Sequence, residues 1–252
     1  MSLLAIGAAA LAIAVGAALQ KIAGMGLALI AGPVLSLVLG PVDGIIVVNA
    51  LAVVNALTNT FSSVRDIEWR TFGLIAPMLV VGSIPGAFVV REGSPGLLQL
   101  TVGILLLIAL AVAMWGKRFV PPLSGKAPAV VAGGIGGFMN TLAGVAGPAI
   151  TVYAEARRWE HRAYAATLQP LFAVGGASSI VVKTATGAAD WSGTEAPLWI
   201  ACLAAVFVGI LVGRLLRGRV AQPIAHRIAL ALAGVGGVAA AVRGVAALVA
   251  GE

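Results

Sequence analysis

Long apolar runs separated by short polar turns make up most of the chain, and the first of these runs is interrupted in its middle. It reaches from Leu3 to Leu39, whereas one relaxed membrane-spanning helix needs only about 20 residues. Gln20 and Lys21 interrupt the run, and the glycines that follow at 24 and 26 loosen a helix there. The pattern predicts two apolar half-segments joined by a polar break, not one long span.

A second interruption of the same kind lies in the other half of the chain, at residues 140–148. Gly144 follows Gly24 by 120 positions, and the same offset pairs further residues of the two halves. These pairs are Gly16 with Gly136, Gln20 with Asn140, Ala23 with Ala143, Asn49 with Gln169, and Pro77 with Pro197. We interpret the offset as an internal duplication in which each half begins with a polar break.

The apolar segments and the composition predict an all-α polytopic membrane protein. Hydrophobic residues make up 60% of the 252 positions and charged residues only 10%, whereas soluble domains carry about 25% charged residues. The first repeat is predicted over 1–116 and the second over 127–252, with a hydrophilic connector at 117–126. The predicted segments are a broken hairpin 3–39 with spans 45–64, 71–90 and 97–115, and a broken hairpin 127–154 with spans 163–182, 196–216 and 223–250.

The distribution of basic residues distinguishes two topologies. If both broken segments cross the membrane, the basic residues divide as 7 against 8, which favours no orientation. If each broken segment is a re-entrant hairpin, the basic residues divide as 12 against 3. The face with three basic residues then holds Arg91, Lys183 and Arg243. Because Lys and Arg collect on the cytoplasmic side, the hairpin topology is favoured, with both termini outside, a cytoplasmic connector and inverted repeats. The alternative, in which the breaks are kinks in full spans, stays open.

The glycine-rich breaks resemble those of a known family of anion permeases. The first break is Ala23–Gly26, followed by Gly32–Pro33, and the second is Gly133–Gly137, followed by Ala143–Pro148. With the duplication and the apolar content, the chain resembles the TauE/SafE family of sulfite exporters over its whole length. This resemblance implies a membrane permease that exports sulfite or organosulfonates, or that moves a related sulfur or carboxylate anion.

The breaks also predict an anion site on physical grounds. A broken helix leaves backbone N–H groups unpaired in the membrane, where only protein or a water-filled cavity can cover them, and a helix start carries partial positive charge. Half-helices that start after Gly24 and after Gly144 would meet near the midplane, and glycine would let an anion approach their N–H groups. We therefore predict a substrate site without metal or catalytic residues. Its residues are Gln20, Lys21, Gly24, Met25, Gly26, Asn49, Asn140, Thr141, Gly144, Val145, Ala146, Gly147 and Gln169.

Several of these side chains also have a purely structural interpretation. Lys21 is the one basic residue in the centre of an apolar run, where ionisable groups are functional candidates, yet in a shallow hairpin it would snorkel to the interface. The amides of Asn49, Asn140 and Gln169 either line the site or hold helices together. Because Asn49 and Gln169 recur at the common offset, we predict that they line one cavity.

Other classes of function are disfavoured by the sequence. His161 and His226, the only histidines, form no metal-ligand pattern with the single Cys202, and no phosphate-binding loop is present. We therefore expect neither an enzyme nor a cofactor. The net charge of +7 comes without basic runs that interleave aromatics, so nucleic-acid binding is not expected.

The expected partners are the lipid bilayer and a small anion such as sulfite or a sulfonate, and the expected location is the inner or plasma membrane, as a multi-pass protein. Two alternatives to an exporter stay open: a non-transporting scaffold or assembly factor, and an importer of a related small anion. A second copy of the chain, in a homo-oligomer, is a further possible partner.

Overall fold

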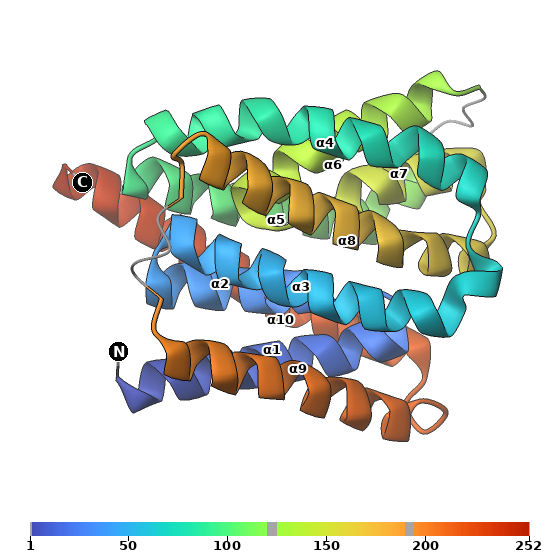
Figure 1. Cartoon of the computed structure of the whole chain (residues 1–252), viewed down its shortest axis with the longest axis horizontal. Helices are drawn as coiled ribbons and strands as arrows, with labels where there is room; N and C mark the ends of the chain where they lie inside the picture. Colours follow the sequence, from blue (N-terminus) through green and yellow to red (C-terminus); the bar gives the residue numbers. More distant parts are fainter. Residues whose placement is uncertain (1, 120–124, 190–193, 252) are drawn as a thin grey trace.

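The structure is a computed structural model that describes residues 2–119, 125–189 and 194–251, and it consists of helices packed side by side (Figure 1). These residues form ten α-helices and one short 3-10 helix, and no β-strand occurs among them, which confirms the predicted all-α fold. The helices are α1 (Leu3–Ala23), α2 (Leu27–Leu39), α3 (Pro41–Ser63), η1 (Val64–Asp66), α4 (Trp69–Glu92), α5 (Pro95–Phe119), α6 (Ala127–Ala143), α7 (Gly147–Arg157), α8 (His161–Ala185), α9 (Ala196–Leu216) and α10 (Gln222–Ala250).

Seven helices of the described chain are long and apolar enough to cross a membrane, which confirms a multi-pass membrane protein. Six of them, α3, α4, α5, α8, α9 and α10, overlap the six predicted spans, and the seventh is α1. Helix α8 runs on to Ala185, so Lys183, which lies just after the predicted span 163–182, is helical. Of the predicted connector 117–126, residues 120–124 lie outside the described part of the chain.

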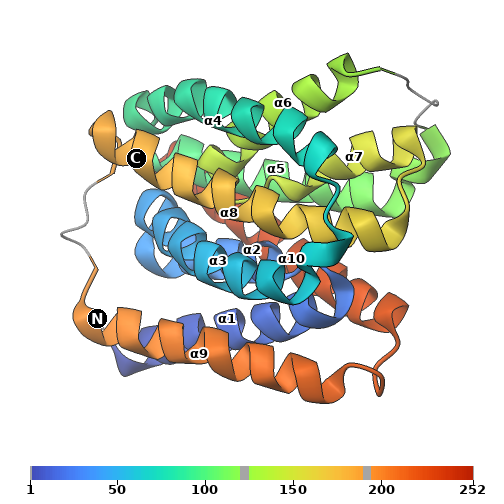
Figure 2. The ribbon, with the colours of Figure 1, turned by 45° about the vertical axis from the view of Figure 1, so that its right-hand side comes forward.

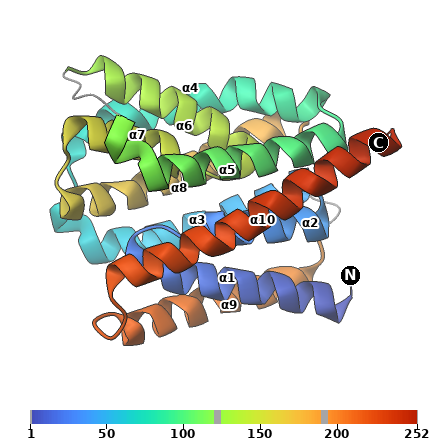
Figure 3. The same cartoon turned by 180° about the vertical axis from the view of Figure 1, so that it is seen from behind.

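Two pairs of helices reverse direction at the predicted breaks. Helices α1 and α2 pack against each other, and so do α6 and α7; each pair returns toward the end from which it came (Figures 1 and 3). Helix α2 has 13 residues and α7 has 11, so at 1.5 Å per residue neither reaches across a hydrocarbon core of about 30 Å. The two chain termini lie at the same end of the molecule (Figure 1).

The helix boundaries repeat at the offset of 120 residues that the sequence pairs show. Helices α1 and α6 end, α2 and α7 begin, and α3 and α8 begin at matching positions. These positions are Ala23 and Ala143, Leu27 and Gly147, and Pro41 and His161. The helix ends therefore follow the same offset as the single residues, while the duplication and the inverted relation of the two halves stay predictions.

Glycines let several helix pairs pack backbone to backbone. A Cβ on Gly82 would overlap the backbone of Gly134, and a Cβ on Gly137 would overlap that of Leu79, so α4 and α6 touch along their length. Helices α1 and α9, side by side in Figure 2, and α5 and α10, adjacent in Figure 3, also pack closely. Lipid offers no hydrophobic drive for helices to associate, so small residues that permit close approach stabilise such packing.

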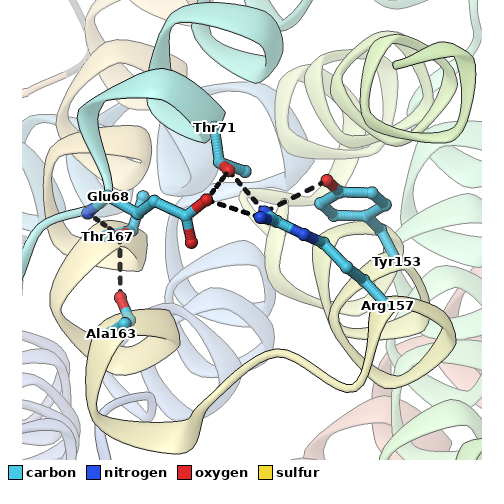
Figure 4. A network of polar contacts seen from close by, with 6 residues as sticks. All are labelled: Glu68, Thr71, Tyr153, Arg157, Ala163 and Thr167. Atoms are coloured by element: carbon cyan, nitrogen blue, oxygen red, sulfur yellow. Dashed lines mark hydrogen bonds and ion pairs between the residues drawn. The ribbon is translucent and has the colours of Figure 1, made fainter. Parts of the chain in front are cut away.

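A polar cluster ties α4, α7 and α8 together near the ends of these helices (Figure 4). Arg157 donates from Nη2 to Glu68 Oε1 at 2.6 Å and from Nη1 to the hydroxyl of Thr71 at 2.5 Å. The same guanidinium lies 5.4 Å from the ring centre of Trp159. The backbone N–H of Glu68 donates to Thr167 Oγ1 at 2.9 Å. Burial acts to raise the pKa of Glu68, but the hydrogen bonds from Thr71 and Arg157 outweigh it and lower that pKa below its usual value.

We expect Glu68→Gln to lower the melting temperature by about 2–4 °C at pH 7, which corresponds to about 1 kcal/mol for a partly exposed charged pair. The lowered pKa means that the carboxylate stabilises the fold above its unfolded pKa and loses this effect as the pH falls. The difference between the two proteins should therefore shrink below about pH 4.5. Thermal unfolding in detergent over a pH series measures it. Glu92→Gln is the control, because the Glu92 side chain is 76% exposed, and an equal shift in that variant would contradict the prediction.

Candidate functional site

Both breaks begin with a glycine in the left-handed backbone region. Gly24 has φ 86° and Gly144 has φ 73°, and their N–H groups close the ends of α1 and α6 on the carbonyls of Gln20 (2.9 Å) and Asn140 (2.8 Å). A side chain is strained in this conformation, so glycine is the residue that ends a helix this way. After two further residues the chain starts α2 at Leu27 and α7 at Gly147.

The starts of α2 and α7 border one central cavity inside the bundle. The cavity has a volume of about 40 Å³, which is room for roughly three waters. Its walls come from both breaks and from α3, α5, α8 and α10. The lining residues are Gln20, Met25, Gly26, Ala28, Leu29, Asn49, Ala52, Ala109, Ala113, Asn140, Gly144, Val145, Ala146, Gly147, Pro148, Thr151, Phe172 and Leu230.

Four buried amides form two crossed pairs beside this cavity. Gln20, in the last turn of α1, donates from Nε2 to Gln169 Oε1 on α8 at 3.1 Å. Asn140, in the last turn of α6, donates from Nδ2 to Asn49 Oδ1 on α3 at 3.3 Å. The two pairs correspond at the offset of 120 residues: Gln20 corresponds to Asn140, and Gln169 corresponds to Asn49. In each pair the residue next to the break is the donor. Each break is thus joined through an amide to a helix of the other half.

The two helix starts differ in how their N–H groups are used. The N–H of Leu27, the first residue of α2, donates to Gln20 Oε1 at 3.1 Å, so one side chain caps α2 and also holds Gln169. Helix α7 carries Pro148 in its first turn, and proline has no N–H to offer. A ligand in the cavity therefore meets two positive helix ends with different sets of donors.

A wide vestibule leads from the end of the molecule opposite the termini to the first break. The vestibule has a volume of about 750 Å³ and is lined by residues of α1, α3, α8 and the turn before α10. Lys21 lies in it and donates from Nζ to Asn59 Oδ1 (2.9 Å) and to Ser62 Oγ (3.0 Å). Arg162 and Arg217 also line it, although Arg162 is paired with Asp66 at 2.9 Å. The vestibule is basic, and Gln20 borders both it and the central cavity.

Residues 8–241 match the family model described as Sulfite exporter TauE/SafE, which covers nearly the whole chain. The chain belongs to this family. No curated protein and no solved structure gives a significant match. The resemblance inferred from the breaks is therefore confirmed, and TauE/SafE membership supports transport of an anion across the membrane.

In this TauE/SafE protein, nine of the thirteen predicted site residues line the central cavity. They are Gln20, Met25, Gly26, Asn49, Asn140, Gly144, Val145, Ala146 and Gly147. Lys21, Gly24 and Gln169 line the vestibule instead. Thr141 is fully buried and donates to the carbonyl of Gly137, away from both spaces.

Two details differ from the expectation. Asn49 and Gln169 do not share a cavity in this structure, because Asn49 lines the central cavity and Gln169 the vestibule. The reason is the Gln20–Gln169 hydrogen bond, which lies between the two spaces. Gly24 ends α1 with its positive φ and borders the vestibule, not the central cavity, and a Cβ there would lie 3.5 Å from Ala165.

The sequence analysis did not predict the other residues that line the cavity, which are Ala28, Leu29, Ala52, Ala109, Ala113, Pro148, Thr151, Phe172 and Leu230. Thr151 lies one helical turn after Gly147 and shares a hydrogen bond of 2.7 Å with the hydroxyl of Tyr164. Phe172 lies on α8, three residues after Gln169. The spacing of Thr151 from the second break was a usable signal, whereas Phe172 looks like any apolar residue of a span. Among the described residues, no three His, Cys, Asp or Glu side chains are placed to hold a metal ion.

Proposed function

We propose that this protein is a secondary transporter or facilitator that exports a small sulfur-containing oxyanion, sulfite or an organosulfonate, through the central cavity. The observation that carries this proposal is that two half-helix starts and three buried amides border one small cavity in the middle of an apolar bundle. Helix starts attract anions through their N–H groups and their partial positive charge. Amide side chains add donors without a fixed charge.

The absence of a lysine or arginine among the residues that line the central cavity suits transport. A transport site must bind its ion firmly enough to take it up and weakly enough to release it. Partial charges and neutral donors satisfy both needs better than a buried ion pair does. A space for roughly three waters also favours a small anion over a large organic acid.

The basic vestibule supports a path into this cavity from one end. Lys21 and Arg217 would raise the local concentration of anions there. The helix ends that bear most of the Lys and Arg residues lie at this end, which the charge bias predicts to be cytoplasmic. An anion that leaves the cell also gains about 2.3 kcal/mol per 100 mV of inside-negative potential, so export needs no second ion.

The test is thermal unfolding and liposome flux of the purified protein across a panel of anions at equal ionic strength. We expect freshly prepared sulfite and methanesulfonate to raise the melting temperature, and chloride and gluconate to leave it unchanged. At about 100 times Kd, a ligand stabilises by about 2.7 kcal/mol, which is a shift of several degrees for a chain of this size. Sulfite-loaded liposomes should then lose sulfite faster than protein-free ones. If no oxyanion shifts the melting temperature or crosses faster, the chain is a scaffold and not a carrier.

A further inference from the structure

Lys183 is a buried lysine that the proposed site does not use. It lies near the end of α8, far along the helix from Gln169, and its side chain is 0% exposed. Its ammonium has no hydrogen-bond partner among the described residues. The charge of Asp43, at the start of α3, acts on it without a hydrogen bond to it. An unpaired ammonium in an apolar interior is costly, so its presence calls for a state in which it is used.

A line of polar groups connects the central cavity to Lys183. Asn49, which lines the cavity, donates from Nδ2 to Ser179 Oγ at 2.9 Å. Ser179 and Lys183 are four residues apart on α8, so they share one face of the helix. Gly176 lies on the same side and brings the backbone of α8 close to the carbonyl of Asn49, 3.0 Å from where its Cβ would be. All of these groups are buried, and they continue away from the vestibule.

The internal duplication relates this buried line to the open vestibule. At the offset of 120 residues, the vestibule residues Gln20, Asn59, Ser63 and Gln169 correspond to Asn140, Ser179, Lys183 and Asn49. The first set borders a space of about 750 Å³, although Gln20, Asn59 and Gln169 are themselves at most 6% exposed. In the second set, Asn140 and Asn49 border only the small central cavity of about 40 Å³, and Ser179 and Lys183 are 0% exposed. The two halves thus hold equivalent residues in different states, one open and one closed. Transporters with inverted repeats move their substrate by exchanging such states between the halves.

We propose that Asn140, Asn49, Ser179 and Lys183 line a second vestibule that opens to the other side of the membrane, and that the ammonium of Lys183 binds the oxyanion there as it leaves the central cavity. This inference rests on the proposed transport function and adds the exit site to it. In the closed state Lys183 is buried, and the charge of Asp43 acts on it without a hydrogen bond. In the open state it becomes the only cation among the four lining residues, and so it gives the exit path its preference for anions.

The first test is the accessibility of two corresponding positions in a Cys202→Ala background. Ser179→Cys should react with a membrane-impermeant thiol reagent added from outside the cell. Asn59→Cys, its counterpart in the open vestibule, should react only from the cytoplasmic side of inverted vesicles. If the cysteine at 179 stays unreactive from outside while the protein transports sulfite, no second vestibule opens and the proposal is overturned.

The second test measures the charge of that vestibule directly. The rates at which an anionic and a cationic methanethiosulfonate reagent modify Ser179→Cys from outside are compared with and without Lys183→Met. We expect the ratio of anionic to cationic rate to fall at least fivefold in the methionine variant, and Lys183→Arg to restore it. An unchanged ratio would overturn the role of Lys183, since a purely structural lysine would not affect charge selectivity. Lys183→Gln replaces the methionine variant if that variant does not reach the membrane.

Flux and binding separate this inference from the proposed function. In Lys183→Met we expect sulfite to raise the melting temperature as in the unaltered chain, because the central cavity is intact, while sulfite flux falls at least tenfold. Normal flux in Lys183→Met would overturn the exit site alone. If the unaltered chain itself shows neither stabilisation nor flux with sulfite, the proposed function fails first.

Discussion

Ala52→Leu is expected to reduce sulfite flux at least tenfold and to remove the rise in melting temperature that sulfite produces, while the protein still folds and reaches the membrane. Ala52 lines the central cavity from α3, one turn after Asn49. Leucine adds three heavy atoms at a place that has room for roughly three waters. The added group is apolar, so it also displaces the water or anion that the helix starts would hold, and leucine is a good helix former.

The matched control for this variant is Ala50→Leu. Ala50 lies on the same helix and is half-buried like Ala52, but it does not line the cavity. The two variants should express equally, and only Ala52→Leu should lose flux per folded molecule. Gly24 and Gly144 are poorer positions for such a test, because their φ values of 86° and 73° would strain any side chain and mix a folding defect with a blocked site. Equal flux in the two alanine variants would mean that the anion does not pass through this cavity.

The fold and the location of the breaks could be predicted because they depend on local patterns. Apolar run length, the interruption at Gln20 and the glycine at 24 are readable in sequence, and they correspond to the end of α1 and the start of α2. The offset of 120 residues indicates the four amides as candidates. It could not show that they pair crosswise, because hydrogen bonds such as Gln20 to Gln169 join residues 149 apart in the chain, and such pairing depends on how the helices pack.

Two charged residues show why the rest could not be predicted from local pattern. Arg157 lies between the predicted hairpin 127–154 and the predicted span 163–182, yet this residue is the last of α7 and its guanidinium reaches Glu68, just before α4. The predicted span 163–182 ends just before Lys183, yet α8 continues past this residue, and Lys183 is completely buried. A single charged residue at the end of an apolar run is typical of a membrane interface. Only its neighbours in three dimensions decide whether it faces water or protein.

The second large effect is expected from adding a carboxylate to either crossed pair. Gln20→Glu and Asn140→Asp keep the size of each side chain and replace a neutral amide with an acid. In Gln20→Glu the new carboxylate can still accept the N–H of Leu27, so the cap of α2 is preserved. It can no longer donate to Gln169 when ionised. Its negative charge beside the helix starts would neutralise their partial positive charge and repel the substrate anion. We therefore expect sulfite flux and sulfite affinity to fall at least tenfold in each variant.

Gln99→Glu separates this effect from the general cost of placing a carboxylate in a membrane helix. Gln99 is buried on α5 and donates to Ser36 on α2 at 3.1 Å, and it borders neither the central cavity nor the vestibule. It therefore shares the burial of Gln20 without its position at the helix starts. If the proposed site is right, Gln99→Glu lowers the amount of folded protein but not the flux per folded molecule. If all three variants lose flux equally, buried charge alone explains the loss. If Gln20→Glu and Asn140→Asp transport normally, the anion is held by groups other than the two helix starts.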